Sequence, residues 1–277
     1  MRIFGLLLKR DFFIGVNKVK KSFLLLLGVN LLVLMYPIYV NNHYNPDELF
    51  SFWDVIGKGI GGTPIVLVKE KIFEFPYTWL LLQLCIATAI GNFIKDDLFS
   101  HSCFVYIRAK SIWKLWASKV LFCLILTIVF YILLFLLVYC AWDVSGKTTN
   151  EWTIYSESLI QSTKLQLSQE QMVLYSIILN FSGTVLITII YSTLSLIMRT
   201  VYSYIVCVCV LFSSVFSDNY ILLGNESMLV RQPLFGQDIF TSIYISIMVQ
   251  FTLSLMFVII GGIYLLRLEI YGDNNEE

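Results

Sequence analysis

Long apolar runs dominate this sequence and restrict what it can fold into. The runs extend over about 16 to 28 residues, and a helix needs roughly 20 apolar residues to cross the hydrocarbon core of a bilayer. Charged residues make up 14% of the chain, whereas soluble domains carry roughly 25%. The sequence therefore predicts an all-α polytopic membrane protein with a single transmembrane domain over residues 1–277.

Six of the apolar runs are expected to be transmembrane helices. They cover about residues 22–40, 75–94, 120–141, 172–198, 201–216 and 239–266. The fifth run is marginal for a full crossing because it has only about 16 residues. If it stops before the outer interface, the apolar part of residues 217–238 can dip back into the membrane. We therefore expect a re-entrant segment before the last span.

Residues 2–21 are expected to form an amphipathic helix ahead of the first span. Apolar side chains recur at helical spacing, and Lys and Arg mostly occupy the other side. This pattern is typical of a helix that lies in the membrane interface and is attracted to anionic lipid. A plain surface anchor and a contact with a partner protein fit the pattern equally well. The residues that represent this interfacial helix are Phe4, Leu8, Arg10, Phe12 and Lys18.

The distribution of basic residues predicts the orientation in the membrane. The N-terminal segment, the C-terminal tail and the loops expected on their side hold 13 Lys and Arg, and the loops on the other side hold 6. Because short loops rich in Lys and Arg stay in the cytoplasm, we expect both termini to be cytoplasmic.

The basic loop at residues 95–119 is the most informative polar stretch. It holds five Lys and Arg, with large apolar and aromatic residues between them. A loop that is only solvated would not need these aromatic residues. We expect a short amphipathic helix at the inner membrane face. This helix either rests in the headgroup layer as a topology determinant, or is the surface through which a second protein moves this one.

The sequence offers no motif for catalysis or for a bound cofactor or metal. Residues 57–62 satisfy GxGxxG, but they lie in a loop expected outside and not between a strand and a helix. His43 and His101 lie in loops on opposite sides of the membrane, so a metalloprotease would lack its ligands. No Asp or Glu falls in the middle of a span, which argues against an ion-coupled transporter. The chain is not expected to be an enzyme, and any transport would take its energy from elsewhere.

Short motifs add a family resemblance to this architecture. The motif in the basic loop consists of Arg108, Ala109, Lys110, Ser111, Trp113, Trp116 and Lys119. Residues 52–54, 61–62 and 219–231 carry further similarity. With these motifs, the whole chain resembles the permease subunit of a bacterial ABC-2-type exporter, of the small Gram-positive peptide or antimicrobial subgroup.

The resemblance implies partners for the chain. Permeases of this family form dimers, so a homodimer or a pair with a related second permease is expected, together with two copies of a separate ATPase. That ATPase would bind ATP and Mg, so the chain itself needs no cofactor, and no nucleic acid is involved. The basic loop would form the coupling helix that fits a groove of the ATPase. The residues implied for this ATPase-coupling interface are Phe104, Arg108, Lys110, Ser111, Trp113, Lys114 and Trp116.

Two functions from different classes follow from these expectations. The first is a multi-pass permease of the bacterial cytoplasmic membrane that moves a peptide, an antimicrobial or another amphiphile out of the cell. The second is a non-transporting immunity or assembly protein of the membrane that acts by binding. Stable association with an ATPase separates the two, and the sequence does not identify the substrate.

Overall fold

The computed structural model describes ten segments of the chain. They are residues 2–44, 50–51, 56, 59–63, 75–100, 111–144, 148–149, 169–217, 222–234 and 239–273. Over these segments the long elements are all helices: α1 (Arg2–Tyr44), α4 (Tyr77–Ile90), α5 (Phe93–Ser100), α7 (Ile112–Val144), α9 (Gln169–Ile197), α10 (Thr200–Phe216) and α11 (Ile239–Asp273). Two short 3-10 helices, η1 (Asn225–Ser227) and η2 (Leu229–Leu234), precede α11. Strands β1 (Phe50–Ser51) and β2 (Thr148–Thr149) form one short parallel pair.

Five apolar stretches are long enough to cross a bilayer. They are Phe4–Tyr36, Tyr77–Leu98, Ile112–Asp143, Val173–Ile197 and Thr241–Arg267. The chain is therefore a multi-pass membrane protein with an all-α fold, as its apolar runs predict. Helix α10 coincides with the fifth predicted span but has only 17 residues, fewer than any of the five stretches named above.

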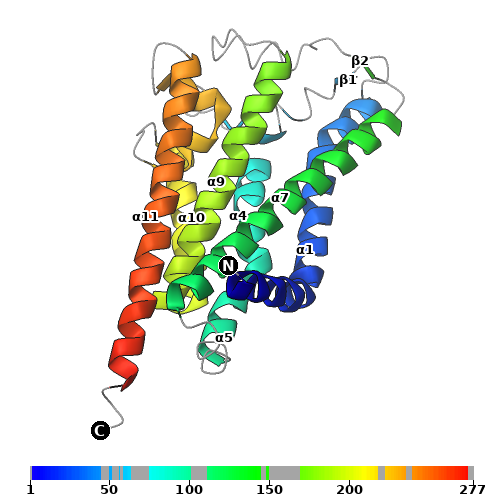
Figure 1. Ribbon diagram of the computed structural model, residues 1–277. Helices are drawn as coiled ribbons and strands as arrows, with labels where there is room; N and C mark the ends of the chain where they lie inside the picture. Colours follow the sequence, from blue (N-terminus) through cyan, green and yellow to red (C-terminus); the bar gives the residue numbers. More distant parts are fainter. Residues whose placement is uncertain are drawn as a thin grey trace.

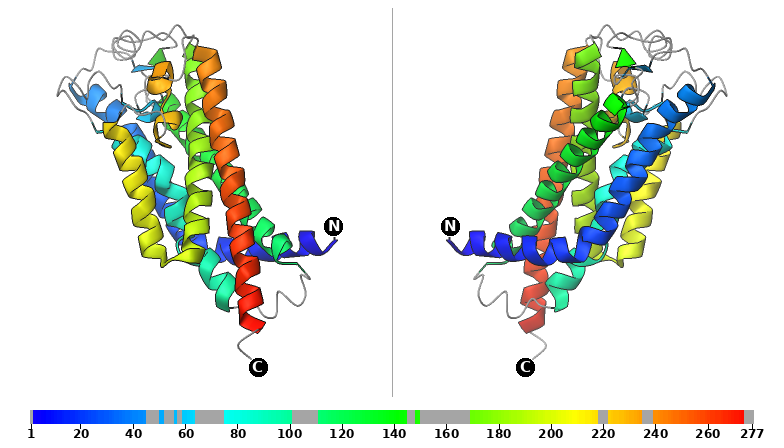
Figure 2. Two further views of the ribbon diagram at one scale, coloured as in Figure 1. Left: turned by 90° about the vertical axis from the view of Figure 1, so that its left-hand side faces the viewer. Right: turned by 90° about the vertical axis from the view of Figure 1, so that its right-hand side faces the viewer.

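The helix ends differ from the predicted span limits at two places. The first predicted span is not a separate helix, because α1 runs without a break from Arg2 to Tyr44; its first part lies across the bundle, and the rest turns upward (Figure 2). The third predicted span begins at Ile112 and not at residue 120. The helix continues through the polar positions before residue 120 because the charge of Lys119 is neutralised inside the protein.

The helices form one bundle with two distinct ends. The start of α1 and the end of α11 lie at the same end, which we call the terminal end, and the opposite end is the loop end (Figures 1 and 2). Helix α9 packs against α4, α7, α10 and α11, while α1 packs against α4 and α7. Helix α5 and the junction between α9 and α10 lie at the terminal end (Figure 1).

Apolar packing holds the bundle together in two clusters. One lies between α1, α4 and α7 and includes Leu27, Ile86 and Leu134. The other lies between α4, α9 and α10 and includes Trp79 and Leu211. Large apolar side chains of α1, α10 and α11 also point outward, and this outer surface suits contact with lipid.

Candidate functional site

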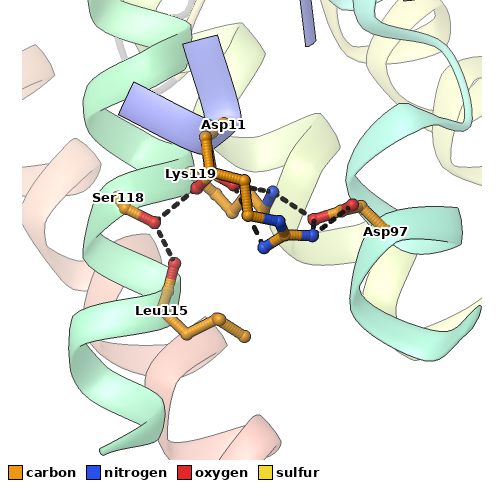
Figure 3. A network of polar contacts seen from close by, with 6 residues as sticks. Asp11, Asp97, Leu115, Ser118 and Lys119 are labelled. Atoms are coloured by element: carbon orange, nitrogen blue, oxygen red, sulfur yellow. Dashed lines mark hydrogen bonds and ion pairs between the residues drawn. The ribbon is translucent and has the colours of Figure 1, made fainter. Parts of the chain in front are cut away.

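Four charged side chains meet inside the protein at the terminal end (Figure 3). Arg10 and Asp11 come from the part of α1 that lies across the bundle, Asp97 comes from α5, and Lys119 comes from the second turn of α7. We call these four residues the ion cluster. Three helices that are far apart in sequence are therefore joined at one point.

Lys119 is the centre of the ion cluster. Its Nζ donates to Asp11 Oδ1 at 2.7 Å and also to Asp97 Oδ2. The guanidinium of Arg10 donates to both carboxylate oxygens of Asp97, at 2.7 and 3.0 Å. The hydroxyl of Ser118 lies 2.5 Å from Asp11 Oδ2. Each carboxylate therefore receives charge-assisted hydrogen bonds, which are stronger than neutral ones.

The ion cluster is buried and its charges are balanced. The side chains of Lys119, Asp11 and Asp97 are 0%, 1% and 2% exposed, and only Arg10, at 23%, reaches the surface. An isolated charge in such a place would cost several kcal/mol in lost hydration. Two cations and two anions in direct contact offset this cost. Lys119 Nζ also lies 4.9 Å from the centre of the Phe93 ring, which favours the cation further.

The ion cluster can link the movements of the helices that contribute to it, α1, α5 and α7. All four charges are satisfied by one another, so the cluster presents no free acid, base or nucleophile of its own. Over the segments that the structure describes, no group of three His, Cys, Asp or Glu side chains could hold a metal ion. What the cluster does is fasten α1 to α5 and α7, the two helices that flank residues 101–110 in sequence.

The predicted ATPase-coupling interface is only partly described. Phe104, Arg108 and Lys110 lie outside the described residues. Ser111 immediately precedes α7, whereas Trp113, Lys114 and Trp116 belong to its first two turns.

The two tryptophans of this region pack on α11. Trp116 is fully buried, and its indole Nε1 donates to the carbonyl oxygen of Val258 at 2.8 Å. Trp113 is 40% exposed and lies over Gly262, while Gly261 faces the Trp116 ring. Trp116 therefore has no exposed surface in this chain to offer to lipid or to a partner, and its contacts serve the packing of α7 on α11.

The predicted interfacial helix, residues 2–21, contributes Arg10 and Asp11 to the ion cluster. Of the residues predicted to represent this helix, Arg10 is the one in the cluster, and Phe4 and Leu8 are half-buried. Phe12 is 48% exposed and makes an edge contact with Phe122, with 6.5 Å between ring centroids. Lys18 is exposed, with its Nζ 5.8 Å from the centre of the Phe93 ring.

Sequence reasoning missed Asp11 and Asp97. Ionisable residues in the middle of a span usually mark a functional site, whereas both of these acids lie near the ends of apolar runs. A usable signal was present: Asp11 directly follows Lys9 and Arg10, and Asp97 follows Lys95. Acids within basic stretches at the membrane interface are candidates for pairing with the surrounding cations.

A scan against protein-family models found no match for this chain, and searches of curated proteins and of solved structures found none either. The fold and the ion cluster together define the class: a multi-pass membrane protein in which the first part of α1 is joined to the helical bundle by buried charges.

Proposed function

We propose that this chain is the membrane-spanning permease subunit of an ATP-driven ABC exporter. A separate ATPase would supply the energy, and a peptide, an antimicrobial or another amphiphile would be the cargo. The observation that carries the proposal is the ion cluster. It joins α1 to α5 and α7. Helices α5 and α7 lie on either side of residues 101–110 in the sequence, and these residues include Arg108 and Lys110.

The ion cluster supplies a path for mechanical force. A partner that pushes on residues 101–110 would load α5 and α7 first. Separating buried paired charges costs several kcal/mol, so α1 would move with those two helices and not slide past them. The bond from Trp116 to Val258 extends the same rigid connection to α11. Movement of residues 101–110 would thus be passed on to α1, α5, α7 and α11.

The remaining parts of the proposal concern the membrane arrangement. Helix α10 is taken as a sixth span, with a length of about 25 Å for 17 residues, slightly less than the roughly 30 Å hydrocarbon core. Residues 222–234 then complete the loop end as a re-entrant segment that is covered by protein and reached by water from the loop end. Both termini are placed in the bacterial cytoplasm. The exposed apolar faces of α10 and α11 would contact lipid or a second permease.

Charge reversal in the basic loop tests the proposal. The double variant Lys110→Glu with Lys114→Glu is reconstituted in vesicles with the partner ATPase. We expect normal insertion in the membrane, since Lys114 is exposed, but loss of substrate-stimulated ATP hydrolysis. The matched control is Lys20→Glu with Lys21→Glu, which reverses two exposed charges of α1. Unchanged hydrolysis in the basic-loop variant would contradict the proposal.

A further inference from the structure

A compact segment closes the loop end of the bundle. Residues 222–234, which we call the cap, contain η1 and η2 and pack against α9 and α11 (Figure 1). Trp79 Nε1 donates to Ser227 Oγ at 3.2 Å, and the backbone N–H of Val230 donates to the carbonyl oxygen of Gly61 at 3.2 Å. Met228 is fully buried. The cap is therefore a docked element with specific contacts.

Gly62 and Gly224 let the cap approach this closely. Gly62 has φ = +92°, where side chains are rarely tolerated, and a Cβ there would lie 2.6 Å from Met228 Cγ. A Cβ on Gly224 would lie 1.9 Å from Ser214 Oγ. At both glycines the cap and its neighbours are in such close contact that no room is left for a side chain.

Arg231 fastens the cap to the end of α10. Its Nε donates to the carbonyl oxygen of Thr63 at 3.0 Å, and its Nη2 donates to that of Val215 at 2.7 Å. Its Nη1 donates to the carbonyl oxygens of Ser214 and Ser217 and to Asn225 Oδ1. The carbonyls of Ser214, Val215 and Ser217 lie at the C-terminal end of α10, where a cation is favoured by the helix dipole. The charge of Arg231 is thus directed at the backbone.

Glu226 in η1 is buried without such a partner. The residue is 4% exposed, and its Oε2 has no hydrogen-bond partner among the described residues. Arg231 makes no ion pair with Glu226 among the described contacts. Its guanidinium donates to backbone carbonyls and to the side-chain amide oxygen of Asn225. In the ion cluster each carboxylate has cationic partners, so the two buried acid sites differ in kind.

The elements that pack against η1 bring little that could balance an ionised Glu226. Helix η2 brings Arg231, which is engaged as described. The described side chains of α9, and those of α11 apart from Arg267 at the terminal end, include no Asp, Glu, Lys or Arg. Among their described side chains, the titratable groups near the loop end are Tyr175 and Tyr244. Glu170 also belongs to the first turn of α9, but its side chain lies outside the described part of the structure. Burial accordingly raises the pKa of Glu226 from its ordinary value of 4.5 to about 8.

We propose that the docked cap binds a proton at Glu226, and that ionisation of this carboxyl releases the cap from α9 and α11. A proton fits better than a metal ion because the described residues hold no group of three His, Cys, Asp or Glu side chains that could bind one. The proposal concerns the loop end alone and does not depend on the exporter assignment.

The direction of the pH effect follows from which state holds the proton. Docking keeps the carboxyl protonated up to pH of about 8, while an undocked Glu226 ionises near 4.5. Docking is therefore strongest below pH 4.5, and its equilibrium constant falls by up to about tenfold per pH unit until pH 8. Alkaline conditions at the loop end would open the cap.

Hydrogen exchange on the full chain in lipid nanodiscs tests this proposal. Exchange of the cap amides is compared at pH 5.5 and 8.5, with times corrected for intrinsic exchange, in the wild type and in Glu226→Gln. In the wild type, we expect protection of the cap to fall at least about tenfold relative to α11. In Glu226→Gln, which mimics the protonated acid, we expect no such fall. The same pH dependence in both proteins would overturn the proposal.

Chemical labelling of the carboxyl provides a second measurement on the wild type. A hydrophobic carbodiimide reacts with protonated buried carboxyls, and peptide mass spectrometry then locates the product. We expect labelling of Glu226 to decline with a midpoint near pH 8, with the exposed Asp143 as a reference for a solvated carboxyl. A midpoint near 4.5 would show that the docked cap holds an ionised glutamate and would contradict the proposal.

Discussion

Lys119 Nζ lies 2.7 Å from Asp11 Oδ1, although the two residues are separated by 108 positions in the sequence. Through this contact the start of α7 is fastened to the part of α1 that lies across the bundle. Both side chains are almost fully buried, so the contact is maintained in a medium where separating the charges is costly. The stability of the terminal end should therefore depend on it.

Lys119→Met tests that dependence. The substitution keeps the length and the apolar stem of the side chain but removes the charge, and it leaves buried Asp11 with only the 3.5 Å contact to Arg10 Nη1 as a cationic partner. We expect a loss of about 3–5 kcal/mol in the free energy of unfolding, measured by denaturation in detergent. Lys114→Met is the matched control, because Lys114 lies on the same helix and is exposed. A loss in Lys119→Met no larger than in the control would contradict the burial argument.

Removing both charges together should cost less than the two single changes added. In Lys119→Met with Asp11→Asn, neither partner is left as an unpaired charge. We expect the double variant to be more stable than the sum of the single variants by about 0.5–3 kcal/mol. The measurement is a double-mutant cycle on the free energy of unfolding. Simple additivity would show that the two residues do not act as a pair.

Gly261→Ala tests the packing of α7 on α11. An added Cβ would lie 2.6 Å from Trp116 Cζ2, and the buried ring has little space to move. We expect a destabilisation of about 1–3 kcal/mol by overpacking. Gly28→Ala is the control, because a Cβ there has nothing within 4 Å and alanine favours the helix by about 1 kcal/mol. Equal effects at the two positions would contradict the proposed close contact.

Arg231→Lys should loosen the cap while leaving the rest of the protein folded. Lysine is a point charge and cannot reproduce the planar set of donors that reaches Thr63 and Val215. We expect faster hydrogen exchange in residues 222–234 and unchanged exchange in α1. Arg267→Lys, at an exposed position of α11, should leave the cap unaffected. Wild-type exchange in the Arg231→Lys cap would mean that these bonds do not hold it.

The membrane fold could be predicted from the sequence because it depends on run length and composition. Each long apolar run is helical, although the second is divided between α4 and α5 at Gly91, and the short fifth run corresponds to the 17-residue α10. The start of α7 could not be predicted in the same way. Lys114 and Lys119 read as loop residues, and only the acids contributed by α1 and α5 make a buried cation tolerable at Lys119.

The ion cluster and the burial of Glu226 could not be predicted from the sequence for a related reason. Asp11, Asp97 and Lys119 are distant in sequence, and pairing across helices leaves no local pattern. Glu226 reads as an ordinary loop acid between Asn225 and Ser227, since nothing in its neighbours reveals that it is 4% exposed. Burial of a polar residue is a property of tertiary packing, whereas an apolar run can be recognised in the sequence alone.

The central claim, that this chain works as an exporter permease driven by a separate ATPase, is tested most directly by purification from native membranes. The full chain is isolated in mild detergent and transferred to nanodiscs, and ATP hydrolysis is measured in the wild type and in Lys110→Glu with Lys114→Glu. The account predicts an associated ATPase whose hydrolysis responds to an amphiphilic peptide in the wild type and not in the variant. A pure chain that carries no ATPase and hydrolyses no ATP would contradict the account and favour a membrane protein that acts by binding.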